Sequence, residues 1–174
     1  MFHMRGVFSS FTKNEWLAIV VVAFGYFVDL FDLLLFSAIR KPSLLGIGVA
    51  ESDIANVGLS LLNWQLYGLL IGGLLWGILA DKFGRLSILF ASILTYSIAN
   101  LLNAYVGNIE QYAILRFIAG LGLAGELGVG ITWVSENVNK NKRTMATMVI
   151  ASLGLLGAVF AAISAITFDW KTCY

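Results

Sequence analysis

The sequence is poor in charge, proline, cysteine and histidine, and these shortages exclude several kinds of protein. Of its 174 residues 12% are charged, and Cys173 and His3 are its single cysteine and single histidine. One cysteine forms no internal disulfide, and together with one histidine it supplies no four-ligand metal site. The net charge of +1 is too small for a nucleic-acid-binding surface. We therefore expect no cofactor, no metal and no nucleic-acid partner.

Apolar residues are abundant instead. They make up 59% of the chain, and the mean hydropathy is +0.87, far from the values of a soluble domain. Five apolar segments of roughly 21 to 24 residues are each long enough to cross a hydrocarbon core of about 30 Å as a helix. They cover residues 16–39, 57–80, 86–106, 111–134 and 145–168. The connections between them are short, so the sequence predicts an all-α membrane protein that forms one unit, residues 1–174, in a lipid bilayer.

Basic residues in the connections predict the orientation of these helices. With the N-terminus inside, the inner side holds more lysine and arginine than the outer side, as the positive-inside rule requires. The inner set is Arg5, Lys13, Lys82, Arg85, Lys140, Lys142 and Arg143, and the outer set is Arg40, Lys41 and Lys171. Pro42, the only proline, is expected to mark the outer end of the first helix. The sequence thus predicts a multi-pass protein of the plasma membrane with its N-terminus inside.

One connection carries a dense group of charges and glycines. Residues 77–89 read GILADKFGRLSIL and join the second and third predicted helices. Read alone, this is a tight inner loop with positive charge. Gly84 permits the backbone reversal that so short a connection needs. Two pairs of glycines four residues apart precede the loop, and such pairs let another helix approach closely. The pairs are Gly68 with Gly72 and Gly73 with Gly77.

The same segment resembles the GxLaDrxGRkxxl signature of the major facilitator superfamily of transporters, in the place where that family has it. The matching positions are Gly77, Leu79, Ala80, Asp81, Gly84, Arg85 and Leu89, whereas Leu86 stands where the family often has a second basic residue. RFIAGLGLAGE, which begins at Arg116, looks like the family's RxxxGxGxG element. Glu136 and Arg143 are spaced like its ExxxxxxR pattern.

The resemblance implies a bundle of inverted three-helix repeats in a protein of twelve spans and two halves. It implies an inner-gate motif in which four charged residues form one cluster: Asp81, Arg85, Glu136 and Arg143. This chain has five spans, and its end, FDWKTCY, resembles the beginning of a sixth. The chain is therefore expected to be a truncated N-terminal half, with the missing C-terminal half as its packing partner.

Four ionisable side chains lie inside the predicted spans: Asp29 and Asp32 in the first, and Arg116 and Glu126 in the fourth. A charge at the bilayer centre costs at least about 2.5 to 3.5 kcal/mol, so these groups should face protein or water. Counted by depth, both aspartates can meet Arg116, whereas Glu126 points elsewhere around its helix. Tyr26 shares the helix face of the two aspartates. These five residues are the candidate substrate- and proton-binding residues.

Two interpretations of these charges stay open. A small anionic metabolite that competes for Arg116 would change the proton affinity of the aspartates, which is a mechanism for proton-coupled symport by alternating access. A permanent ion pair that locks the first helix to the fourth explains the same residues. Asp29-Leu-Phe-Asp32 and GLAGELG are similar to the aromatic-acid and metabolite proton symporter branches of the family. The segment GLLGAVFAA lacks the GPxxGG element of its drug antiporters, which favours symport.

A non-functional truncated membrane fragment or a structural assembly partner is the alternative to a transporter. An intramembrane enzyme is not expected, because no histidine or cysteine lies in the spans. The GxGxxG of residues 120–125 lies inside an apolar span and is expected to be a helix-packing surface rather than a dinucleotide site. Asn63 and Gln65 are expected to form interhelical hydrogen bonds. The substrate, the choice between symport and uniport, and independent folding stay undetermined.

Overall fold

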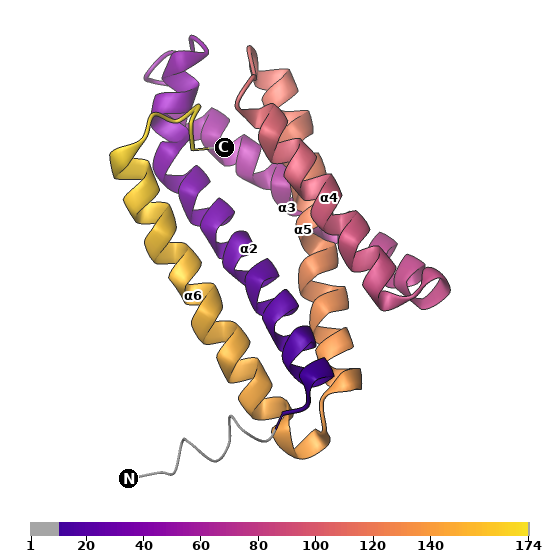
Figure 1. The fold of residues 1–174 in the computed structure, drawn as a ribbon. Helices are drawn as coiled ribbons and strands as arrows, with labels where there is room; N and C mark the ends of the chain where they lie inside the picture. Colours follow the sequence, from indigo (N-terminus) through magenta and orange to yellow (C-terminus); the bar gives the residue numbers. More distant parts are fainter. Residues whose placement is uncertain (1–10, 174) are drawn as a thin grey trace.

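The computed structural model describes residues 11–173, apart from the side chain at position 127. His3 and Arg5, which the sequence predictions use, lie outside the described residues. Five long helices follow one another, and a short 3-10 helix, η1, precedes the last of them (Figure 1). They are α2 (Lys13–Gly46), α3 (Ile54–Phe83), α4 (Arg85–Asn103), α5 (Ile109–Asn137), η1 (Lys140–Lys142) and α6 (Arg143–Thr167). No strand occurs in residues 11–173, and the predicted all-α class is confirmed.

All five long helices of the described part are long and apolar enough to cross a membrane. The protein is thus an integral multi-pass membrane protein. Figure 1 shows that successive helices run in opposite directions, with α2 between α6 on one side and α4 and α5 on the other. The α3–α4 turn and the α5–α6 connection lie at the end of the bundle where α2 begins. The C-terminal residues lie at the opposite end.

The helix α2 is longer than the sequence predicts. It continues through Pro42 to Gly46, so the expectation that Pro42 marks its outer end is wrong. Proline removes one backbone hydrogen bond, but the turn that follows it is held by buried contacts. The Ser43 hydroxyl lies 3.3 Å from the Tyr112 hydroxyl of α5, and Leu44 is fully buried. After the helix ends at Gly46, the chain turns at Gly48, whose positive φ of 86° few other residues adopt.

The turn between α3 and α4 consists of one residue, Gly84, with φ of 90°. Its N–H donates to the carbonyl of Ala80, and α4 begins at the next residue. The predicted backbone reversal at this glycine is confirmed. The turn sets Arg85 at the first position of α4, facing the end of α5.

Glycines bring α3 and α5 into backbone contact. A Cβ atom at Gly68 would collide with the carbonyl oxygen of Phe117, and one at Gly120 would collide with the carbonyl oxygen of Gln65. A Cβ atom at Gly72 would likewise collide with the carbonyl oxygen of Leu121. The predicted close approach therefore holds for the first glycine pair of α3. The second pair faces open space, with no atom within 4 Å of a Cβ at Gly73 or Gly77.

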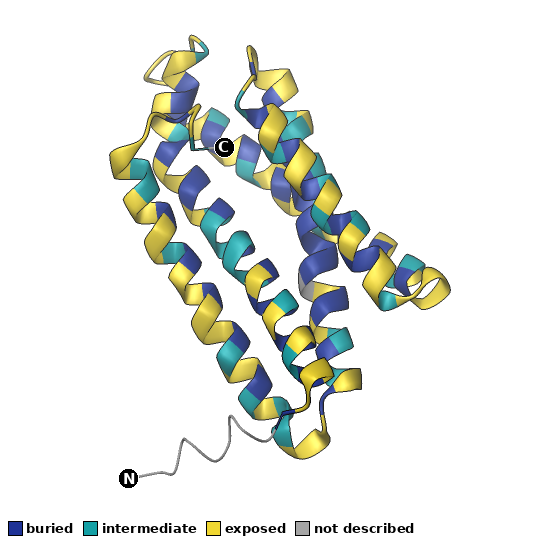
Figure 2. Ribbon diagram, in the orientation of Figure 1, coloured by how far each residue is buried: buried dark blue, intermediate teal, exposed yellow. Residues whose placement is uncertain are grey.

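The helix α5 is the most enclosed element of the bundle, and Figure 2 shows it buried along much of its length. Its glycines Gly122 and Gly125 pack on Tyr96 and Ser92 of α4, so the GxGxxG sequence is a helix-packing surface. The outward faces of the other helices expose large apolar side chains, among them Leu70, Leu74, Ile98, Ile163 and Ile166. In water such a surface would aggregate, and lipid is the solvent that suits it.

Substitution of the two kinds of glycine on α3 should give opposite results. Gly68→Ala places a methyl group against the backbone of α5, and overpacking of this kind costs about 1 to 3 kcal/mol. Gly73→Ala is the matched control, because it adds the same methyl group on the same helix in open space. Thermal unfolding in detergent, followed by tryptophan fluorescence, should show a lower midpoint for Gly68→Ala and an unchanged or higher one for Gly73→Ala. Equal midpoints would contradict the close crossing of α3 and α5.

Candidate functional site

A buried ion pair lies at the centre of the bundle. Nη1 of Arg116 on α5 is 3.3 Å from Oδ2 of Asp32 on α2, and the two side chains are 0% and 1% exposed. The guanidinium of Arg116 also stacks on aromatic rings, 4.0 Å from the ring centre of Phe36 and 5.5 Å from that of Tyr112. Such cation–π contacts are strongest where water is excluded. The predicted contact between Arg116 and the first helix is thus present for Asp32.

Gln65 of α3 extends this pair to a third helix. Its side-chain amide donates to Oδ2 of Asp32 at 3.0 Å, and its oxygen accepts from Nη1 of Arg116 at 3.4 Å. The amide bridges the two charged groups, so that α2, α3 and α5 meet in one polar network. The interhelical role expected of Gln65 is confirmed. Asn63, considered with it, lies on the exposed face of α3.

Asp29 lies one turn earlier on α2 and differs sharply from Asp32. It is 1% exposed, and neither of its carboxylate oxygens has a hydrogen-bond partner in residues 11–173. Its charged neighbours are two other carboxylates, those of Glu126 and Asp32. Residues three apart differ by about 60° around a helix, which is enough to turn Asp29 away from the direction of Asp32. Both aspartates were expected to meet Arg116, and the structure shows an ion pair of Arg116 with Asp32.

Glu126 of α5 faces α2. Its side chain is 4% exposed, and Oε1 has no hydrogen-bond partner among the described residues. Close approach is possible because residue 25 is a glycine: a Cβ there would lie 3.0 Å from Oε2 of Glu126. Glu126 thus belongs to the same buried region as Asp29, although it points away from the Asp32–Arg116 pair, as its place on the helix predicts.

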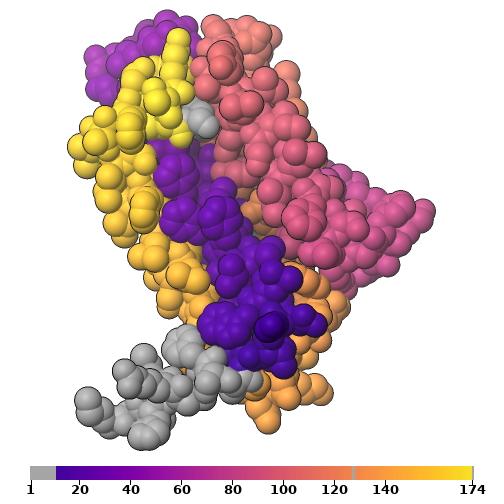
Figure 3. Space-filling view, in the orientation of Figure 1, coloured from indigo at the N-terminus to yellow at the C-terminus, as the bar shows by residue number. Residues whose placement is uncertain are grey.

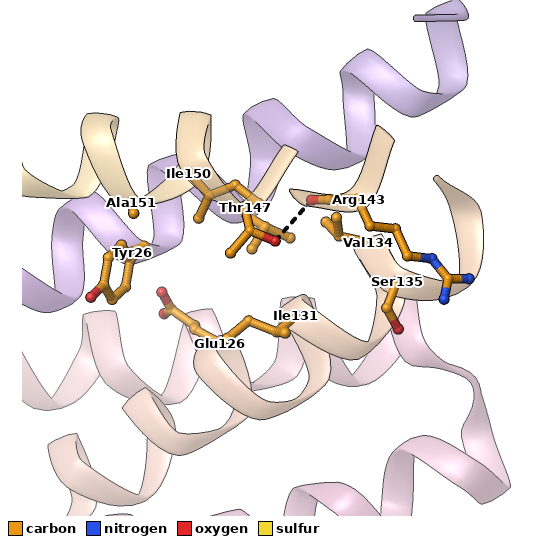
Figure 4. A pocket seen from close by; sticks show the side chains of 10 residues that line it. Tyr26, Glu126, Ile131, Val134, Ser135, Arg143, Thr147, Ile150 and Ala151 are labelled. Atoms are coloured by element: carbon orange, nitrogen blue, oxygen red, sulfur yellow. Dashed lines mark hydrogen bonds between the residues drawn. The ribbon is translucent and has the colours of Figure 1, made fainter. Parts of the chain in front are cut away.

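A cavity of about 390 Å³ opens beside Glu126, between α2, α5 and α6. Its walls are mainly apolar, and its lining residues are Val22, Tyr26, Glu126, Ile131, Val134, Ser135, Arg143, Thr147, Ile150 and Ala151. Figure 4 shows the Glu126 carboxylate at one end, turned toward Tyr26, and the Arg143 guanidinium beside Ser135 at the other. An apolar cavity with a few polar groups at its ends is typical of a small-molecule site.

Three of the four residues of the expected inner-gate cluster meet at the end of the bundle. The Arg85 guanidinium lies 3.0 Å from the Asp81 carboxylate and 3.2 Å from that of Glu136. The fourth, Arg143, is not brought into this group. Its Nε donates to the carbonyl of Val138 at 3.2 Å, and the residue lines the cavity. Of the two motif glycines, Gly84 makes the turn and Gly77 faces open space.

Sequence reasoning missed one buried acid, Glu15 at the start of α2. Its carboxylate caps α2 by accepting from the Thr12 N–H, and it also accepts from the Asn139 N–H at 3.1 Å. Lys142 of η1 lies 3.7 Å away. The Thr12-x-x-Glu15 spacing is a capping-box signal that could have located this residue. Glu15 fastens the beginning of α2 to the α5–α6 connection.

A bundle of apolar helices that buries charges and carries a polar-ended cavity is the architecture of a membrane transporter. The chain belongs to the Major Facilitator Superfamily, whose family model matches residues 16–174. Its relatives are transporters rather than enzymes.

Three relatives illustrate the range of names in this group. A Haemophilus influenzae protein provisionally named as a metabolite transport protein is 34% identical, over 82% of this chain and 35% of its own length. The sialic acid transporter NanX of Escherichia coli is 31% identical over 79% of this chain and 33% of its own length. The niacin transporter NiaP of Acinetobacter baylyi is 30% identical over 87% and 34%. The chain thus spans about a third of the length of the curated relatives it matches.

The buried pair should tolerate joint replacement better than the loss of one partner. Arg116→Met leaves the Asp32 carboxylate buried without its cation, which costs about 3 to 5 kcal/mol. The double variant Asp32→Leu/Arg116→Met removes both charges and should recover most of this loss. Unfolding midpoints in detergent for the wild type, both single variants and the double variant measure the coupling. Additive effects of the two substitutions would contradict the ion pair.

Proposed function

We propose that this chain functions in a secondary transporter that moves a small anionic metabolite together with protons by alternating access. Asp29 binds the proton, and the cavity beside Glu126 and Tyr26 receives the substrate. The observation that carries the proposal is the buried Asp29 carboxylate, which has no hydrogen-bond partner in residues 11–173 and has a second unsatisfied carboxylate beside it.

The balance of buried charge favours a proton site. Asp32 is compensated by Arg116 and Gln65, whereas Asp29 and Glu126 have no such partner among the described residues. Two neighbouring carboxylates are costly inside a membrane when both are ionised, and a bound proton relieves both their repulsion and their desolvation. A proton that enters or leaves such a pair changes its charge next to the substrate cavity. This is the coupling that symport requires.

The anionic character of the substrate is supported by the relatives. Three relatives are named as transporters of sialic acid, niacin and 4-hydroxybenzoate, and each of these compounds is a carboxylic acid. Arg116, for which the sequence suggested that the substrate competes with the aspartates, is enclosed and ion-paired. Its proposed role is therefore to position α2 against α5. The second candidate function is that of a non-transporting assembly partner, in which the buried charges are only structural. A structural role accounts for the Asp32–Arg116 pair, but it leaves Asp29 and Glu126 unexplained.

Alternation needs contacts that open and close. The ion pairs of Arg85 with Asp81 and Glu136 are partly exposed, and pairs of this kind contribute about 0 to 1 kcal/mol each. Contacts this weak can bias a two-state gate without freezing it. We place this cluster at the inner side of the plasma membrane, with the N-terminus inside. The exposed glycine face of Gly73 and Gly77 suits close packing against a C-terminal half of the kind that the resemblance implies.

Uptake driven by a pH gradient tests the proposal. In proteoliposomes of the chain, an acidic exterior should drive accumulation of labelled nicotinate or 4-hydroxybenzoate. Asp29→Asn should reduce gradient-driven uptake at least about 10-fold, because its amide cannot carry a proton. The matched control Asp169→Asn changes an exposed acid after α6 and should behave as the wild type. Gradient-driven uptake that persists in Asp29→Asn, or that follows sodium instead of pH, would contradict proton binding at Asp29.

A further inference from the structure

Arg143 is held in one orientation while part of its hydrogen-bonding capacity stays unused. It is the first residue of α6, its side chain is half-buried, and its Nε donates to the Val138 carbonyl at 3.2 Å. Within residues 11–173, neither terminal nitrogen of its guanidinium makes a hydrogen bond or an ion pair. The bond at Nε fixes the plane of the guanidinium, and the outer edge of the group can still hold a carboxylate with two parallel bonds.

The acids near this end of the bundle are already engaged elsewhere. Asp81 and Glu136, which the sequence assigned to a cluster with Arg143, both bind Arg85. Glu15 binds Lys142 and two backbone N–H groups. The protein therefore supplies no anion to Arg143 in its described part, although Arg143 lines the largely apolar cavity between α2, α5 and α6.

The opposite end of the same cavity carries a buried acid. Glu126 is 4% exposed and lines the cavity, and its Oε1 has no hydrogen-bond partner among the described residues. Figure 4 shows its carboxylate turned away from Arg143. Glu126 and Ser135, which lies beside Arg143, are nine residues apart on α5, a separation of about 13 Å along the helix. The two groups are therefore too far apart to pair, and Arg143 is the basic residue among those that line this cavity.

We propose that Arg143 is the anion-binding residue of this cavity and that it takes the carboxylate of a small carboxylic acid with an apolar body. The apolar body packs along Ile131, Val134 and Ile150, and the uncharged end of the ligand points toward Glu126. This assignment rests on the proposed function only in treating the ligand as the transported substrate. It moves the substrate's anionic end away from the enclosed Arg116 and to the end of the cavity where α5 meets α6.

Equilibrium binding of benzoate and benzamide tests this assignment. The two probes have the same ring, and only benzoate is charged. Isothermal titration calorimetry on the whole chain in nanodiscs, without a pH gradient, should show that benzoate binds about 10- to 100-fold more tightly than benzamide. Arg143→Gln should remove this preference. Arg143→Lys keeps the charge but loses the fork and the bond to Val138, and should keep part of it. The matched control Lys140→Gln removes an exposed cation three residues earlier and should leave the preference intact.

Comparison of the two probes separates a binding role from a structural one. Equal affinity of the wild type for the two probes, absence of binding of either probe, or benzoate binding that survives Arg143→Gln would overturn the proposal. Equal weakening of both probes by Arg143→Gln would also overturn it, because that result indicates a collapsed cavity. Since no proton gradient is present, a failure of proton coupling at Asp29 would leave the result for Arg143 standing.

Discussion

The fold depends on how the bundle compensates charge inside the hydrocarbon. The Asp32–Arg116 pair is fully enclosed, and Gln65 from a third helix makes a hydrogen bond to each member. Losing one member would leave a buried charge, so α2, α3 and α5 are held in one relative arrangement. The glycines at the α3–α5 crossing make this arrangement possible, because a methyl group at Gly68 or Gly120 would separate the backbones that carry Gln65 and Arg116.

Beside this ion-paired network lie two buried acids without a countercharge among the described residues, Asp29 and Glu126. Asp29 and Glu126 are buried like Asp32. Both oxygens of Asp29 and Oε1 of Glu126 have no hydrogen-bond partner in residues 11–173, and the two carboxyl groups lie near enough to interact electrostatically. In the proposed mechanism, a proton changes the charge of these acids while the ion-paired network beside them keeps the bundle together. Figure 3 shows α2, which carries both aspartates, lying at the surface between α6 and α4. A shift of this helix would therefore move the proton site and the cavity wall together.

Much of this arrangement could be predicted from the sequence, because apolar length, glycine spacing and charge depth are local properties. These predict the helical bundle, the turn at Gly84 and the contact of Arg116 with α2. The directions of side chains could not be predicted, since they depend on neighbours distant in the chain. Pro42 continues its helix because tertiary contacts outweigh one missing hydrogen bond. Arg143 leaves the expected cluster because Arg85 already occupies its acids and the Val138 carbonyl is nearer.

The central proposal is that the proton resides on Asp29 rather than on Asp32, which is paired with Arg116. Infrared spectroscopy of the carboxylic-acid C=O band, recorded on the chain in lipid as the pH is raised, tests it most directly. The account predicts a band of a protonated buried acid that loses intensity in Asp29→Asn and keeps it in Asp32→Asn. A band that survives Asp29→Asn and disappears in Asp32→Asn would contradict the account.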